Sequence, residues 1–96
     1  GYSVGTVRTY FGGNSKAIAS GETEGMVKLV FDKETGLLLG SHIFGPHAAD
    51  LIHEAAQAIA RRATVQELAR LVHVHPTLAE TLEEAYRRAA HSLAKA

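Results

Sequence analysis

The sequence predicts an α+β domain in which helices cover one face of an antiparallel sheet of about four strands. Two observations predict this class. Apolar residues alternate with a period of two in the first half of the chain, whereas they recur at helical spacing in the second half. A chain of 96 residues has the size of one domain, so we expect residues 1–96 to form a single domain.

Two strands joined by a tight turn form the clearest part of the predicted sheet. In the segment 27–32, every second residue is large and apolar, which is typical of a half-buried strand. The segment DKETG at 32–36 then predicts a turn in which Gly36 can adopt a positive φ. The segment LLLGSHIF at 37–44 continues as the second strand of a hairpin.

The remaining strands are predicted upstream of this hairpin. The segment SVGTVRTYF at 3–11 is rich in valine, threonine and aromatic residues, which favour strands. GGNS at 12–15 predicts a turn that returns the chain into KAIAS at 16–20. With the hairpin, these segments make about four strands.

The second half of the chain predicts three helices. The segment 48–62 places apolar residues on one helical face: Leu51, Ile52, Ala55, Ala56 and Ile59. TVQEL at 64–68 has the Thr-x-x-Glu pattern of a capping box and begins a short helix that ends near Leu71.

The third predicted helix begins near Thr77. Its apolar residues recur at helical spacing: Leu78, Leu82, Ala85, Ala89 and Leu93. Oppositely charged residues four positions apart are expected to pair on its solvated side: Glu83 with Arg87 and Glu84 with Arg88.

The composition excludes several classes of protein. Ten basic and ten acidic side chains give a formal net charge of zero, so no basic patch predicts a nucleic-acid partner. No apolar run approaches the ~20 residues that span a bilayer, and we expect a soluble, cytoplasmic protein with no membrane partner. The absence of cysteine excludes a disulfide framework and a cysteine nucleophile within the chain.

The segment HVHPTLAE at 73–80 concentrates residues that can carry chemistry. Pro76 favours an extended backbone before it, which would place His73 and His75 on the same face. Imidazoles are common metal ligands, but further ligands would have to come from other histidines whose spacing recommends none of them: His42, His47, His53 and His91. We therefore expect no metal site.

Acid–base chemistry is the second interpretation of this segment. The unperturbed pKa of histidine lies near neutral pH, and a carboxylate bonded to the far ring nitrogen orients the imidazole. Glu80, in the first turn of the predicted helix, could serve His75 in this way. Alternatively, Thr77-x-x-Glu80 is itself a capping box, in which Glu80 accepts a hydrogen bond from the Thr77 backbone N–H. Spacing alone leaves both open.

The longer segment HVHPTLAETLEEA resembles the C-terminal signature of the dihydrolipoamide dehydrogenases, which are pyridine nucleotide–disulfide oxidoreductases. The segment 21–80 is similar to the interface domain of that family from strand to strand and helix to helix. The resemblance implies the dimerisation-domain fold of FAD- and NAD-linked reductases, in a homodimer whose interface domain reaches the partner's active site. It implies that His75 is the catalytic acid/base, that Glu80 is its catalytic partner, and that His75 and Pro76 contact the FAD of the partner subunit.

The implied reaction is the oxidation of dihydrolipoamide, carried on a lipoyl domain, to lipoamide. Electrons would pass through a redox disulfide and FAD to NAD⁺. The family's redox cysteines, FAD segment and NAD domain are absent from these residues, so we expect a fragment of a larger flavoenzyme that is inactive alone and binds no cofactor.

Three alternatives to this function stay open. The chain could belong to another disulfide reductase of the family, similar to glutathione reductase, although His73 and Leu78 favour the lipoamide branch. It could be a non-catalytic homodimerisation module, in which the histidines serve packing and capping. A metal-binding domain that uses His73 and His75 is the least favoured alternative.

Overall fold

The computed structural model describes residues 3–21, 24–45, 48–71, 77 and 79–94. In chain order, the elements are β1 (Val4–Tyr10), the 3₁₀ turn η1 (Phe11–Gly13), α1 (Ser15–Ser20), β2 (Met26–Asp32), β3 (Leu38–Phe44), α2 (Ala48–Ala60), α3 (Val65–Leu68) and α4 (Ala79–Ala94). The predicted α+β class is confirmed.

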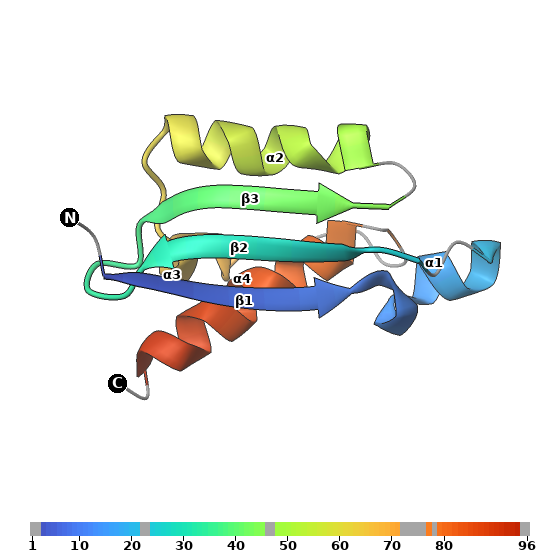
Figure 1. Ribbon diagram of the computed structural model, residues 1–96, viewed down its shortest axis with the longest axis horizontal. Coiled ribbons are helices and arrows are strands. Elements are labelled where there is room, and N and C mark those ends of the chain that lie inside the picture. Colours follow the sequence, from blue (N-terminus) through green and yellow to red (C-terminus); the bar gives the residue numbers. More distant parts are fainter. Residues whose placement is uncertain (1–2, 22–23, 46–47, 72–76, 78, 95–96) are drawn as a thin grey trace.

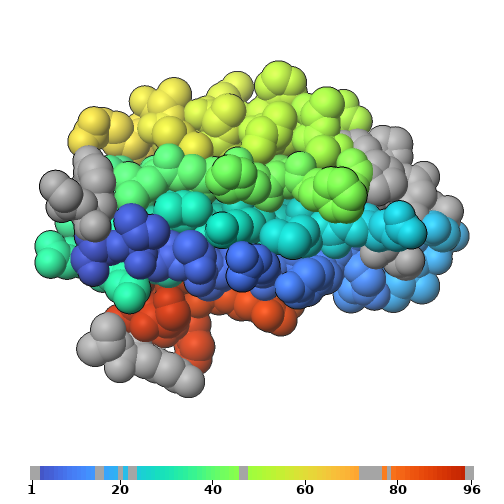
Figure 2. All heavy atoms as spheres, in the orientation of Figure 1, coloured from blue at the N-terminus to red at the C-terminus, as the bar shows by residue number. Residues whose placement is uncertain are grey.

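The three strands form one antiparallel sheet in the order β1-β2-β3. Helices α3 and α4 lie behind this sheet, whereas α2 runs alongside β3 (Figure 1). On the opposite face, the side chains of all three strands reach the molecular surface, and no described helix crosses them (Figure 2). Helices α3 and α4 therefore cover one face of the sheet, as the sequence predicts, while α2 lies along its edge.

The hairpin of β2 and β3 is confirmed, and Asp32 organises its turn. One carboxylate oxygen of Asp32 accepts a hydrogen bond from the backbone N–H of Glu34 at 3.1 Å, and the other accepts one from the Thr35 hydroxyl at 2.9 Å. Gly36 has a φ of 83°, as predicted, and a Cβ at this position would overlap the Gln66 side chain. The turn thus favours glycine for its backbone conformation, whereas the end of the exposed Gln66 side chain could move aside.

The segment 16–20 is helical, and the described residues contain three strands rather than four. Asn14 forms the N-cap of α1, since its side-chain oxygen accepts a hydrogen bond from the backbone N–H of Ala17 at 3.0 Å. Gly21, with a φ of 76°, ends the helix in the left-handed conformation. Both signals are typical of helix ends, and they explain why KAIAS is a helix rather than the predicted strand.

One apolar core joins the sheet to the helices. Buried side chains from the strands and from Phe11, α3 and α4 form this core: Phe11, Val27, Leu29, Phe31, Leu38, Val65, Leu68, Leu82, Ala85, Tyr86 and Ala89. The predicted inner face of α4 is confirmed at Leu82, Ala85, Ala89 and Leu93, whereas Leu78 lies outside the described residues. Tyr86, which is fully buried, was not part of the predicted face.

Both predicted charge pairs of α4 form, although the glutamate of one pair is nearly buried. The Arg87 guanidinium lies 3.0 Å from the Glu83 carboxylate, and that of Arg88 lies 2.9 Å from the Glu84 carboxylate. Glu83 is only 8% exposed, so its placement on the solvated side was wrong. The long arginine side chain brings its charge to a carboxylate that lies close to the core.

Helix α2 is confirmed, with a different buried face. Ala55 and Ala58 are buried, and Leu51 and Ile59 pack against the core. Ala56, which was expected to share this face, is exposed. Because α2 lies beside the sheet edge rather than over its face, as Figure 1 shows, it buries a narrower stripe.

The predicted capping box at the start of α3 is confirmed. The Glu67 backbone N–H donates to the Thr64 hydroxyl oxygen at 3.2 Å, and the Thr64 backbone N–H donates to the Glu67 carboxylate at 2.9 Å. These bonds to Thr64 are the main cause of the lowered pKa of Glu67, and Arg70 and Arg61 lower it further. The cap therefore favours the ionised form of this carboxylate.

This lowered pKa predicts an acid-dependent loss of stability. Since the pKa of Glu67 is lower in the folded chain than in the unfolded chain, its contribution is present above its ordinary value of 4.5. That contribution is lost as the pH falls through the folded-state pKa. Chemical-shift titration should place the pKa of Glu67 below its ordinary value of 4.5. Urea unfolding of Glu67→Gln should lose this part of the pH dependence, and an unchanged dependence would contradict the assignment.

The packing of α4 predicts a large difference between two leucine truncations. Leu82 is fully buried, so Leu82→Ala should lower the free energy of unfolding by about 2–5 kcal/mol through lost contacts and a cavity. Leu71 is 42% exposed, and Leu71→Ala should change it by less than about 0.5 kcal/mol. Urea denaturation of the two variants measures the difference. Equal losses would show that α4 does not anchor the core.

Candidate functional site

The candidate site lies at the N-terminal end of α4, where the sequence places Glu80 in the first turn. The Thr77 backbone N–H donates a hydrogen bond to Oε1 of Glu80 at 2.9 Å, and the Glu80 N–H donates to the Thr77 carbonyl at 3.3 Å. The predicted capping contact of Glu80 therefore forms. A negative side chain is also favourable here, because backbone N–H groups converge at the start of a helix.

Two side chains from the beginning of the chain hold this turn in place. The Asn14 side-chain amide donates a hydrogen bond to the Thr77 carbonyl at 2.8 Å, across 63 positions of sequence. The Thr9 hydroxyl donates one to the Thr81 carbonyl at 2.8 Å, across 72 positions. Asn14 is 6% exposed and Thr9 is 1% exposed. Buried bonds of this kind are costly to lose, so the turn is fixed relative to β1 and α1.

A small polar hollow lies beside Glu80. It has a volume of about 90 Å³ and is lined by Gly13, Asn14, Glu80, Thr81 and Glu84. Two of these residues come from the segment before α1, and three come from α4. The hollow therefore follows from the docking of α4 on η1 and α1.

A buried tyrosine connects α4 to α2. The Tyr86 hydroxyl donates a hydrogen bond to the Glu54 carboxylate at 3.0 Å. Burial and the nearby charge of Glu54 raise the pKa of Tyr86, so that the phenol stays protonated and remains a donor. Helix α4, which carries Glu80, is thus linked to α2.

The structure locates Glu80 but not the histidine predicted to act with it. His73, His75 and Pro76 lie outside the described residues, as does His47. The predicted contacts of His75 with Glu80 and of His75 and Pro76 with FAD therefore stay predictions.

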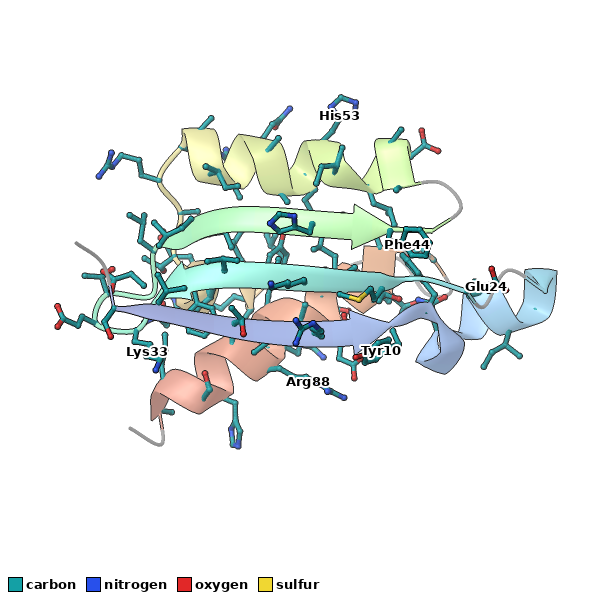
Figure 3. The ribbon with its side chains drawn as sticks, in the orientation of Figure 1. Tyr10, Glu24, Lys33, Phe44, His53 and Arg88 are labelled. Carbon is teal, nitrogen blue, oxygen red and sulfur yellow. The ribbon has the colours of Figure 1, made fainter. Side chains whose placement is uncertain are left out.

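The described histidines lie on separate elements. His42 is exposed on β3, and His91 is exposed on α4. His53 projects from α2 away from the sheet (Figure 3). In the part of the chain that the structure describes, no group of three or more histidine, cysteine, aspartate or glutamate residues is placed to hold a metal ion. No helix in the same part is both long and apolar enough to cross a lipid bilayer.

Sequence reasoning missed Asn14 and Thr9 as parts of this site. Asn14 stood within a predicted turn, although an asparagine just before Ser-Lys-Ala is a typical N-cap signal. No sequence signal connects either residue to α4, because both contacts span more than sixty positions.

The sequence of this chain matches a known family of domains. Residues 1–86 match the model of a family described as "Pyridine nucleotide-disulphide oxidoreductase, dimerisation domain". The chain belongs to this family.

Within the family, the chain is similar to dihydrolipoyl dehydrogenases. It is 62% identical over 89 residues to the dihydrolipoyl dehydrogenase of Synechocystis, a match that covers 93% of this chain and 19% of that protein. It is 46% identical to the chloroplastic dihydrolipoyl dehydrogenase 2 of Arabidopsis thaliana, over 93% of this chain and 16% of that protein. The chain thus spans about a fifth of the length of these relatives.

A solved structure shares this fold. LpdA from Mycobacterium tuberculosis matches with a TM-score of 0.86 and 33% sequence identity, over 91% of this chain and 19% of that protein. The predicted dimerisation-domain fold is therefore confirmed.

The contact between Thr77 and Glu80 predicts different effects for two substitutions of Glu80. Glu80→Gln keeps an oxygen that can accept the Thr77 N–H, so most of the capping contribution should remain. Glu80→Ala removes this acceptor and should lower the free energy of unfolding by about 1 kcal/mol. Urea unfolding of both variants of the chain tests the contact. Equal destabilisation by the two substitutions would contradict it.

Proposed function

We propose that this chain is the dimerisation domain of a homodimeric dihydrolipoyl dehydrogenase, and that it supplies His75 and Glu80 to the partner's active site. The 62% identity to the Synechocystis dihydrolipoyl dehydrogenase, which extends over 93% of the chain, carries this proposal. The substrate is dihydrolipoamide borne by a lipoyl domain.

The geometry at the start of α4 supports a role for Glu80 beyond capping. Its Oε1 accepts the Thr77 N–H, but a carboxylate has two oxygens with about four acceptor sites between them. The capping and orienting roles that the sequence left open are therefore compatible. Since Thr77 follows Pro76 directly, Glu80 is fixed to the backbone just two residues beyond His75.

The proposed chemistry begins with a proton transfer. A free thiol has a pKa near 8.5 and is mostly protonated at neutral pH, whereas the thiolate is the species that attacks a disulfide. His75 accepts the proton of one substrate thiol, and Glu80 stabilises the imidazolium that forms. The thiolate then attacks a redox disulfide of the enzyme, which forms a mixed disulfide and releases one enzyme thiolate. The second substrate thiol passes its proton to the enzyme thiolate released first, and its sulfur attacks the substrate sulfur of the mixed disulfide. This step displaces the second enzyme sulfur as a thiolate and closes the lipoamide ring.

FAD and NAD⁺, when bound by the whole enzyme, would accept the two electrons that the redox cysteines receive. The chain itself contains no cysteine, so these cysteines must belong to other parts of the enzyme. We accordingly propose that the 96 residues alone have no dithiol-oxidising activity. The cytoplasmic location stays a prediction, since the relatives include chloroplastic and mitochondrial forms.

A chimera tests the proposed acid–base pair in a complete enzyme. In the Synechocystis dihydrolipoyl dehydrogenase, the matching segment is replaced by this chain, and His75→Gln is introduced. Oxidation of dihydrolipoamide by NAD⁺ should fall by about 10²–10⁴-fold, which is the usual contribution of general acid–base catalysis. Glu80→Gln should also lower it. The reduction of ferricyanide by NADH should stay unchanged, because it consumes no thiol proton.

The exposed His91 supplies the matched control. His91→Gln removes an imidazole from the far end of α4 and should leave both activities unchanged. Flavin absorbance and the dimer mass verify that each variant is assembled. If His75→Gln and Glu80→Gln retain full dithiol turnover in assembled dimers, the domain serves dimerisation only. If the chimera prefers glutathione disulfide with a reduced nicotinamide, the assignment to the lipoamide branch is wrong.

A further inference from the structure

We infer that Asn14 is a positioning residue for the Glu80 carboxylate and acts on it through the backbone of Thr77. This inference rests on the proposed function, in which Glu80 orients the catalytic imidazole. Three residues form a continuous chain of hydrogen bonds. The Asn14 amide donates to the Thr77 carbonyl at 2.8 Å, and the Thr77 N–H donates to Oε1 of Glu80 at 2.9 Å.

The surroundings of Asn14 make this chain of hydrogen bonds rigid. Its side chain is 6% exposed and uses both ends, because its oxygen caps α1 while its nitrogen reaches Thr77. An amide held at both ends cannot rotate without leaving a buried polar group unpaired. The position of α1 is thereby transmitted to Thr77, which lies two residues before the start of α4.

Hydrogen bonds hold both the carbonyl and the N–H of Thr77. Its carbonyl accepts from Asn14 and from the Glu80 N–H, and its N–H donates to Glu80. The Thr77 hydroxyl, in contrast, has no hydrogen-bond partner among the described residues. The backbone rather than the hydroxyl therefore holds Glu80, and Asn14 is the side chain that sets this backbone from outside α4.

Two substitutions separate the functions of Asn14. Asn14→Asp and Asn14→Ser both keep an oxygen that can cap α1, since aspartate and serine are N-cap residues as good as asparagine. Aspartate, when ionised, has no hydrogen to donate, and serine is too short to serve Ala17 and Thr77 together. Both variants should thus retain α1 and lose the bond to Thr77.

The test measures both activities in the chimeric enzyme. Each Asn14 variant should lower kcat for dihydrolipoamide by on the order of 10-fold, because a small displacement of a catalytic group is costly. KM for dihydrolipoamide and the rate of ferricyanide reduction by NADH should not change, since a positioning defect affects the proton transfer alone. Thr64→Ala, which removes the cap of α3, is the matched control and should leave both activities unchanged.

A double substitution shows whether Asn14 acts through Glu80. In a Glu80→Ala background, Asn14→Ser should cause no further loss of dithiol turnover, because the group that Asn14 positions is absent. An additional 10-fold loss in this background would overturn the inference. So would a parallel loss of ferricyanide reduction or of bound flavin in both Asn14 variants, which would show a purely structural role.

The failure of the inference is distinguishable from that of the proposed function. If His75→Gln and Glu80→Gln lower dithiol turnover but neither Asn14 variant does, the acid–base pair stands and the role of Asn14 is refuted. If none of these substitutions lowers it, the proposed function fails and the inference fails with it.

Discussion

The packing of α4 against β1 and β2 is the interaction on which the rest of this structure depends. Leu82, Ala85 and Ala89 bury one face of α4 on the sheet, and two of these three side chains are as small as a methyl group. Small side chains allow the helix axis to approach the strands closely, so that Val27 and Leu29 are also fully buried. Without this contact, the three-stranded sheet would expose both faces to water, and a sheet of this size is marginal without a packed layer.

Apolar packing holds α4 on the sheet but does not fix its position along its own axis. A helix can slide on an apolar surface at small cost, because dispersion and apolar burial have little directionality. Hydrogen bonds supply the missing direction. Thr9 bonds to the Thr81 carbonyl and Asn14 bonds to the Thr77 carbonyl, both at 2.8 Å and both at the N-terminal end of α4. These two bonds therefore fix α4 along its axis near Glu80, where the proposed chemistry requires it.

The parts of the fold that the sequence predicts correctly are those governed by local signals. The β2–β3 hairpin follows from alternation and from the Asp32–Gly36 turn, and α3 follows from the Thr64–Glu67 capping box. The GGNS turn signal predicted that the chain returns as a strand at 16–20, whereas Asn14 and Gly21 bound a helix there. In a segment this short, the signals at its two ends decide between helix and strand.

Errors of a second kind arise from tertiary geometry. Glu83 lies on the face predicted to be solvated, yet it is nearly buried, and Ala56 lies on the face predicted to be buried, yet it is exposed. Helical periodicity gives the direction of a side chain around its own axis but not where the neighbouring layer ends. The contacts of Asn14 and Thr9 with α4 were beyond sequence reasoning for the same reason. Asn14 and Thr9 contact α4 and the turn before it only because of the tertiary arrangement of the sheet and helices.

The same arrangement makes the domain a suitable carrier for the carboxylate of Glu80 in its proposed catalytic role. A group that must act across an interface has to be placed accurately relative to that interface, and rigid elements do this better than loops. Glu80 lies on a helix that packs on the sheet and bonds to α2 through Tyr86 and Glu54, while Asn14 at the start of α1 bonds to Thr77 just before that helix. A displacement of any one of these elements would be resisted by buried hydrogen bonds to the others. In the proposed homodimer, the position of Glu80 would thus follow the position of the whole domain rather than the local mobility of its own segment.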